Sequence, residues 1–143
     1  MHRLIGRGPG ALALGAALVL LAGCSSKPEV AQVSGTVKFK GEPVPAGWIS
    51  FTPEPGKGTV RVCQIKDGVF DSSKESQPGI FPGRNVVRIA GFDGVKVKFW
   101  GQGKQIFNPV DDEMDVPNGT TTREFVIPEA AGRNVRIEPT ADE

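Results

Sequence analysis

Every leucine of this 143-residue chain lies within its first 21 residues, and this distribution constrains the fold more than any other feature. From residue 32 onward the apolar side chains are mainly Val, Ile and Phe, with frequent Thr between them. β-Branched and aromatic residues favour strands over helices. In several segments they alternate with polar residues, which is the period of a strand with one buried face. We therefore expect an all-β domain after residue 31.

The expected strands are short and are separated by turns rich in Gly and Pro. They are predicted at residues 33–39, 48–52, 59–65, 69–72, 84–92, 120–127 and 134–138, with tight turns at 66–68 and 118–119 and a helical turn at 128–132. The alternation slips between Val62 and Cys63, as a bulge would cause. Residues 95–99 are predicted as a further strand or a hairpin arm, whereas 101–119 show little periodicity. Seven or eight strands with turns about every 8 to 12 residues suggest a β-sandwich.

The first 23 residues have the pattern of a targeting segment. Arg3 and Arg7 precede an apolar run at residues 11–21, with no acidic residue before it. A membrane-spanning helix needs about 20 apolar residues, so this run has the length of a signal-peptide core instead. The sequence Leu21-Ala22-Gly23-Cys24 follows directly.

This order of segments resembles a bacterial lipoprotein precursor, in which Leu21, Ala22 and Gly23 form the lipobox before the modified cysteine. The resemblance implies cleavage before Cys24, a thioether-linked lipid on Cys24 and acylation of the new amino terminus. Several acyl chains give stable membrane attachment, where one chain would be marginal. The alternative is an ordinary secretory signal with an incidental Cys24. Ser25, rather than Asp, after the cysteine implies the periplasmic face of the outer membrane in an envelope with two membranes.

On this interpretation the chain has four parts: a signal peptide (1–23), a lipidated tether (24–31), a β-sandwich domain (32–139) and a frayed C-terminus (140–143). Seven extended residues after Cys24 reach at most about 25 Å. The domain would therefore stay close to the membrane, where we expect its partner.

The composition argues against an enzyme. Cleavage after residue 23 would remove His2, the only histidine, and hydrolytic triads usually need a histidine base. Lipidation of Cys24 would leave Cys63 as the only thiol, so no disulfide forms, and we expect Cys63 to be buried. Neither a catalytic site nor a cofactor is expected. A net charge of +1 gives no signal for nucleic acid. The acidic run at 111–115 is predicted as a solvated loop, because it lacks the spacing of a calcium-binding loop, and no metal site is expected.

Several short motifs occur in a recognisable order. They are Val33-Ser34-Gly35-Thr36-Val37, Gly41-Glu42-Pro43-Val44, Trp48-Ile49-Ser50-Phe51-Thr52-Pro53, Ile65-Lys66-Asp67-Gly68-Val69-Phe70 and Pro82-Gly83-Arg84-Asn85-Val86-Val87-Arg88-Ile89. This series resembles carboxypeptidase-regulatory-like, or transthyretin-like, domains, and the segment from Asp115 to Pro128 is similar to small lipoproteins of this type from planctomycete-like bacteria. The resemblance implies a transthyretin-like (Ig-like) β-sandwich of about seven strands and no shared catalytic residue set.

Two tryptophans are the candidate contact residues. Alternation places Trp48 and Trp100 opposite the apolar faces of their strands, and exposed indoles stack on sugars or seat a protein partner. The alternative is that they cap a sandwich edge or pack under a loop. Lys96, Lys98 and Lys104 lie near Trp100 in the sequence, and the short tether suggests that they face anionic headgroups.

The sequence thus predicts a membrane-anchored, non-catalytic envelope lipoprotein that acts as a binding or structural module, with an envelope protein as its expected partner. The alternative is a carbohydrate-binding module that recognises an envelope polysaccharide.

Overall fold

The fold is all-β. The computed structural model describes residues 29–96, 98 and 101–135, and within these ranges no helix is long and apolar enough to cross a membrane. The elements are β1 (Gln32–Phe39), β2 (Glu42–Pro43), β3 (Ala46–Pro53), β4 (Arg61–Lys66), β5 (Val69–Asp71), β6 (Gly83–Phe92), β7 (Gln105–Val116) and β8 (Thr120–Ile127), with two single 3-10 turns, η1 (Ser72–Lys74) and η2 (Glu129–Gly132).

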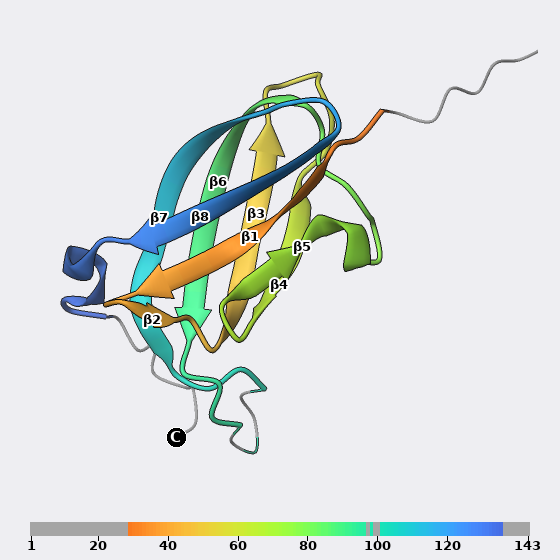
Figure 1. The fold of residues 1–143 in the computed structure, drawn as a ribbon. Helices are drawn as coiled ribbons and strands as arrows, with labels where there is room; N and C mark the ends of the chain where they lie inside the picture. Colours follow the sequence, from red (N-terminus) through yellow and green to blue (C-terminus); the bar gives the residue numbers. More distant parts are fainter. Residues whose placement is uncertain (1–28, 97, 99–100, 136–143) are drawn as a thin grey trace, which may run out of the picture.

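The strands form one sheet that curls on itself into a sandwich (Figure 1). The order is β2-β1-β5-β4-β3-β6-β7, and β8 pairs with β1 in parallel. One layer therefore holds β8, β1, β5 and β2, and the other holds β4, β3, β6 and β7. The β4–β5 hairpin joins the layers through a single pair, Lys66 with Val69. The β-sandwich expected from the sequence is confirmed.

The core lies between the two layers and is built by the predicted alternation. In β1, Val33, Gly35 and Val37 point inward, while the residues between them are partly exposed. In β6, Val87 and Ile89 point inward, whereas Val86 and Arg88 are exposed on the outer side. The fully buried side chains include Phe51, Phe70, Phe107, Ile49, Ile80, Val44 and Val116. This burial is the main force that holds the layers together.

Two predicted turns are confirmed. Between β4 and β5, Asp67 and Gly68 have φ values of 51° and 76°, the left-handed pair that a tight hairpin turn needs. Between β7 and β8, residues 117–119 reverse the chain, and Gly119 has a φ of 89°. The helical turn predicted near Pro128 is also present, as η2.

The acidic run at 111–115 is part of strand β7, so the prediction of a solvated loop there was wrong. β7 is an edge strand that pairs only with β6, and the register shifts twice, between Ile89 and Phe92 of β6. Several positions of β7 that would be buried in a central strand are therefore exposed, and the sequence shows no clean alternation. Its acidic residues lie beside basic residues of β6 rather than in a free loop.

Other expectations need smaller corrections. β4 has no bulge, because Val62 and Cys63 pair in sequence with Ser50 and Ile49; the apparent slip arises because Val62 is 53% exposed. Residues 95–96 and 134–135 lie outside any strand. The rest of the predicted final strand, from 136 to 138, lies outside the described residues.

Candidate functional site

Of the candidate lipidation and tryptophan contact residues, the structure describes only Trp48. Cys24, the lipobox residues Leu21, Ala22 and Gly23, and the second tryptophan, Trp100, lie outside the described residues. The signal peptide and its lipidation therefore stay predictions.

Trp48 lies on the outer side of the layer formed by β4, β3, β6 and β7. It is half-buried, and its Cα partners are Gln64 of β4 and Ala90 of β6. We call this side the Trp48 face; its members are Trp48, Ser50, Thr52, Val62, Gln64, Val86, Arg88 and Ala90. Ala90 is only 2% exposed although it faces outward, so neighbouring side chains cover it. The Trp48 indole therefore lies on the outer side of the sheet between strands β4 and β6, partly exposed to solvent.

Ion pairs flank the Trp48 face along β7. Arg84 Nη2 lies 2.7 Å from a carboxylate oxygen of Glu113, and Arg88 Nη1 lies 3.5 Å from Asp111. Exposed pairs of this kind add little to stability. They do, however, leave no strong net charge on this side, and a shallow hollow beside them is lined by Arg84, Glu113, Met114 and Asp115.

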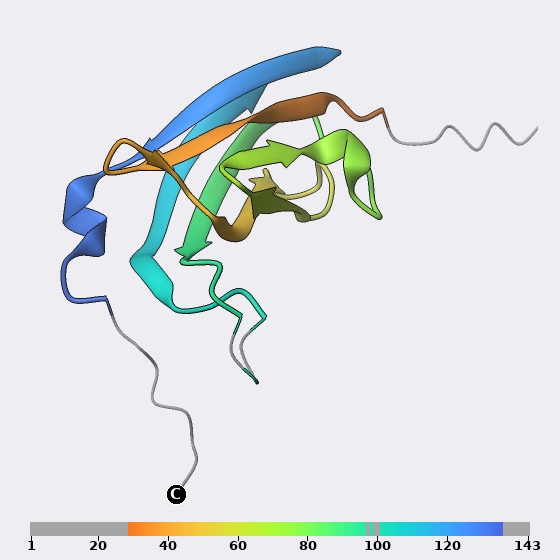
Figure 2. The same cartoon turned by 60° about the horizontal axis from the view of Figure 1, so that its bottom comes forward.

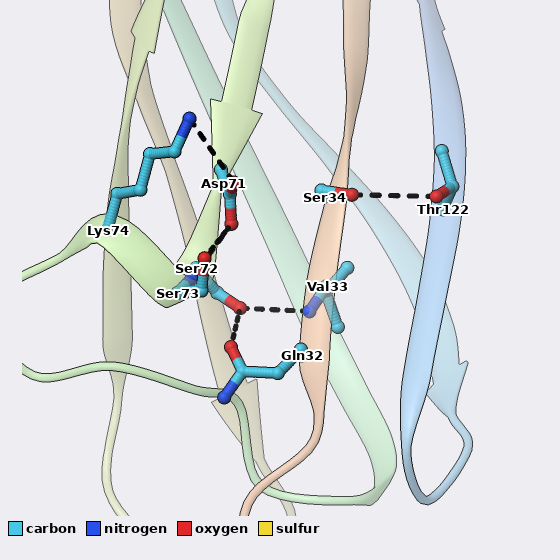
Figure 3. A network of polar contacts seen from close by, with 8 residues as sticks. All are labelled: Gln32, Val33, Ser34, Asp71, Ser72, Ser73, Lys74 and Thr122. Carbon is cyan, nitrogen blue, oxygen red and sulfur yellow. Dashed lines mark hydrogen bonds and ion pairs between the residues drawn. The ribbon is translucent and has the colours of Figure 1, made fainter.

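On the outer side of the layer formed by β8, β1, β5 and β2, polar side chains of β1 and β8 pair with one another. Ser34 and Thr122 lie 3.5 Å apart through their hydroxyl oxygens (Figure 3), Thr36 donates to Glu124 at 3.4 Å, and Lys38 pairs with Glu124 at 3.1 Å. Among the described residues of this side there is no aromatic ring. It offers less for a ligand than the Trp48 face does.

The chain enters the sandwich at a firmly held point. Ala31 and Ile80 exchange two backbone hydrogen bonds of 2.7 and 2.8 Å, and the Val33 amide donates to Ser72 Oγ at 2.8 Å (Figure 3). Asp71 accepts from the amide and the hydroxyl of Ser73, and these bonds hold the pKa of Asp71 below its usual value. The start of the described chain is therefore fixed at one end of the domain.

The described residues of the connection between β6 and β7 (93–96, 98 and 101–104) lie at the opposite end of the sandwich (Figures 1 and 2). We call this connection the 93–104 arm. Its base is tied by Asp93, whose Oδ1 accepts from the amides of Val95 at 2.9 Å and Lys104 at 3.0 Å. Backbone bonds from Asp93 to Lys104 and from Gly94 to Gln102 complete the base.

The arm carries three lysines, and its position fixes the end of the domain at which they lie. Lys96, Lys98 and Lys104 are exposed on it. They lie at the other end of the described domain from Ala31, where the chain enters the sandwich. That they face anionic headgroups stays a prediction. The hydrogen bonds that Asp93 accepts from Val95 and Lys104 were not predicted from the sequence. The Asp-Gly pair at 93–94 and Gly103 are nevertheless typical of a structured turn.

Cys63 is a buried thiol, as expected. It is 1% exposed within β4. Burial, followed by the negative charges of Glu75 and Asp71, raises the pKa of Cys63 to about 12. The thiolate, which is the reactive form, is therefore disfavoured at neutral pH.

We predict that Cys63 in the folded protein resists iodoacetamide at pH 8 and reacts at the ordinary thiol rate once the protein is unfolded. The pKa of Cys63 in the fold lies above the ordinary thiol value of 9.0, so the contribution of this thiol to stability is intact below about pH 9 and is lost as the pH rises toward 12. Alkylation rates with and without denaturant, followed by mass spectrometry, test this. Equal rates in both states would contradict it.

Among the described residues, no group of three or more His, Cys, Asp or Glu side chains is arranged to hold a metal ion.

No family model matches the chain, and no curated protein matches it. Among solved structures, the chain is similar to a DUF3823 family protein from Parabacteroides merdae, with 13% sequence identity and a TM-score of 0.40. The match covers 70% of this chain and 46% of that chain, so this chain spans less than half of the length of that structure. The function proposed below therefore rests on the residues of this chain.

Proposed function

We propose that this protein is a non-catalytic binding or structural module of the cell envelope, anchored to a membrane by lipid on Cys24. Two features support the proposal. The sequence before residue 25 resembles a lipoprotein leader, and the tether enters the domain at a point fixed by Ala31, Ile80 and Ser72. The resemblance to transthyretin-like domains, which have no shared catalytic residues, agrees with it.

The Trp48 face is the surface that this function would use, and its composition is the observation that carries the proposal. It combines a half-buried indole with exposed Val62 and Val86 on rigid central strands. Aromatic anchors surrounded by modest apolar and polar contacts are typical of the centres of protein interfaces. The outer side of β1 and β8 lacks such an anchor among its described residues.

Photo-cross-linking in the native membrane tests this proposal. A photoreactive amino acid is placed either at position 62 on the Trp48 face or at position 122 on the opposite side, both solvent-exposed strand positions. We expect a reproducible, stoichiometric protein adduct from position 62 and none from position 122. Equal adducts from both positions, or none from either, would count against a protein-binding role of this face.

The second candidate is a carbohydrate-binding module, and the partly exposed position of Trp48 on the outer side of the sheet favours it. Gln64 and Arg88 lie on the same face and have the hydrogen-bonding groups that sugar hydroxyls need.

We predict that Trp48→Ala weakens glycan binding about 30-fold, because loss of a central aromatic anchor commonly costs 2 kcal/mol or more. Val126→Ala on the outer side of β8 is the control and should change binding less than threefold. Affinity for a polysaccharide array, measured alongside thermal unfolding of each variant, checks both. Unchanged binding by a folded Trp48→Ala variant would remove Trp48 as the platform.

A further inference from the structure

The segment that forms the 93–104 arm and the start of β7 has an unusual charge distribution. Residues 94–110 contain three lysines and no acidic residue, whereas residues 111–115 contain four acids. Because β7 runs away from the arm, this sequence pattern separates the charges in space. The basic part lies at the end of the sandwich that bears the arm, and the acidic part lies along the flank beside Arg84 and Arg88.

The base of the arm is an ordered structure rather than a loose loop. Asp93 Oδ1 accepts two backbone amides, one from each side of the arm, at 2.9 and 3.0 Å. Gly103 is buried against this carboxylate, and a Cβ at that position would collide with Asp93 Oδ1. Lys96 and Lys104 stay exposed on this base. Loops that are positioned by a rigid scaffold commonly carry binding residues.

The arm adjoins the Trp48 face at a row that contains a lysine and an aromatic ring. In this row Lys66, Ala46, Phe92 and Gln105 are consecutive Cα partners across β4, β3, β6 and β7. Lys66 is exposed and Phe92 is half-buried. Trp48 lies two residues along β3 from Ala46, on the same side of the sheet. Lys66, Phe92 and Trp48 therefore share one side of the sheet, and the arm begins directly after Phe92.

Acidic groups at this end only partly offset the lysines. Asp93 is engaged with the two amides of the arm. Asp67 and Glu42 occupy the neighbouring β4–β5 turn and strand β2. Glu129 of η2 lies at this end too, because η2 packs beside the start of β7. Against these four carboxylates stand Arg133 and five lysines (Lys40, Lys66, Lys96, Lys98 and Lys104), so this end of the described domain has an excess of positive charge.

We propose that this basic end, formed by Lys66, Phe92 and Trp48 on one side of the sheet and by Lys96 and Lys104 of the adjoining arm, binds an anionic polysaccharide. The proposal deepens the carbohydrate-binding candidate and rests on it. A polymer with a carboxylate on each sugar places repeated negative charges along an extended chain, which matches lysines spread over the arm and β4. The sugar faces stack on the aromatic rings. The arm lies away from the tether, so an anchored molecule presents this surface to polymer beyond the membrane.

The test uses polygalacturonate as the anionic probe and its fully methyl-esterified form as a neutral probe with the same backbone. Binding to the full-length protein in detergent is measured by calorimetry in about 20 mM and about 150 mM salt, because screening weakens exposed charge interactions as salt rises. The variant is Lys96→Gln/Lys104→Gln. The matched control is Lys57→Gln/Lys74→Gln, which removes the same charge from exposed sites elsewhere. Poly-glutamate is included as an acidic polymer without sugar rings.

We expect the wild type to bind polygalacturonate more tightly than the ester, and to lose this preference at higher salt. Lys96→Gln/Lys104→Gln should weaken binding to polygalacturonate about tenfold at low salt, with the control variant unchanged. Trp48→Ala should weaken binding to both polysaccharides.

Three results would overturn the proposal. Equal binding of the charged and esterified polymers would refute the anionic preference while leaving a neutral carbohydrate-binding module standing. Equal binding of poly-glutamate with no effect of Trp48→Ala would assign the basic end to an acidic protein segment instead. Absence of polygalacturonate binding would reject the proposed ligand, whereas the protein-binding role is decided separately by the cross-links from position 62.

Discussion

Gly35→Ala is expected to lower the free energy of unfolding by about 3 kcal/mol, near the upper end of the range for overpacked sites. Gly35 pairs with Arg123 in the parallel contact between β1 and β8. A Cβ on Gly35 would collide with the backbone carbonyl oxygen of Arg123. Backbone atoms cannot move aside as a flexible side chain can, so β8 must shift away from β1. Urea unfolding, monitored by tryptophan fluorescence, measures the change.

Gly101→Ala is the matched control, because a Cβ at Gly101 meets no atom within 4 Å. We expect it to change the free energy of unfolding by less than about 0.5 kcal/mol. If Gly35→Ala proved as mild as Gly101→Ala, the parallel β1–β8 pairing would be wrong.

Phe70→Ala is expected to destabilise the protein by about 3 to 5 kcal/mol, the usual cost of emptying a phenylalanine site in a core. Phe70 is 1% exposed and lies on β5, the short strand where the two layers join. Its ring centroid is 6.2 Å from that of Phe51 and 5.9 Å from that of Phe125. Truncation therefore removes contacts to both layers at once.

The neighbouring residue Val69 provides the control. It lies on the same strand but is 53% exposed, so Val69→Ala should stay within about 0.5 kcal/mol of the wild type. Chemical denaturation of the two variants under one set of conditions compares them directly. Similar losses for both would show that the inner and outer sides of β5 are assigned incorrectly.

The central strands could be predicted from the sequence because they bury one side along their whole length. β1 and β6 show this clearly, with Val33, Val37, Val87 and Ile89 inward and polar residues between them. The turns at Asp67-Gly68 and Asn118-Gly119 could be predicted because turn formation depends on local sequence. Each turn needs a backbone conformation that glycine adopts easily.

The edge strand β7 could not be predicted in the same way. Its exposure depends on what lies beside it: η2 packs near its start, and Arg123 of β8 reaches Asp112 at 3.2 Å across its end. These partners are distant in sequence, so no local pattern records them. The parallel pairing of β8 with β1 has the same origin, because it joins residues about 90 positions apart.

The candidate site was predicted in part. Alternation placed Trp48 on the outer side of its strand, and the structure confirms this. The neighbours that give the face its character, Gln64 and Ala90, come from other strands and follow only from the register. The lysines near residue 100 were noted in the sequence, but their position away from the tether required the three-dimensional arrangement.

Palmitate labelling tests the anchored-module account most directly. Cells that produce the wild type, Cys24→Ala or Cys63→Ala are grown with radiolabelled palmitate, and the protein is isolated from membranes. Cys63 is the matched control because it is the only other cysteine and is buried in β4. We expect label in the wild type and in Cys63→Ala, and both label and membrane association lost in Cys24→Ala. Label that persists in Cys24→Ala, or a wild type without label, would contradict the account.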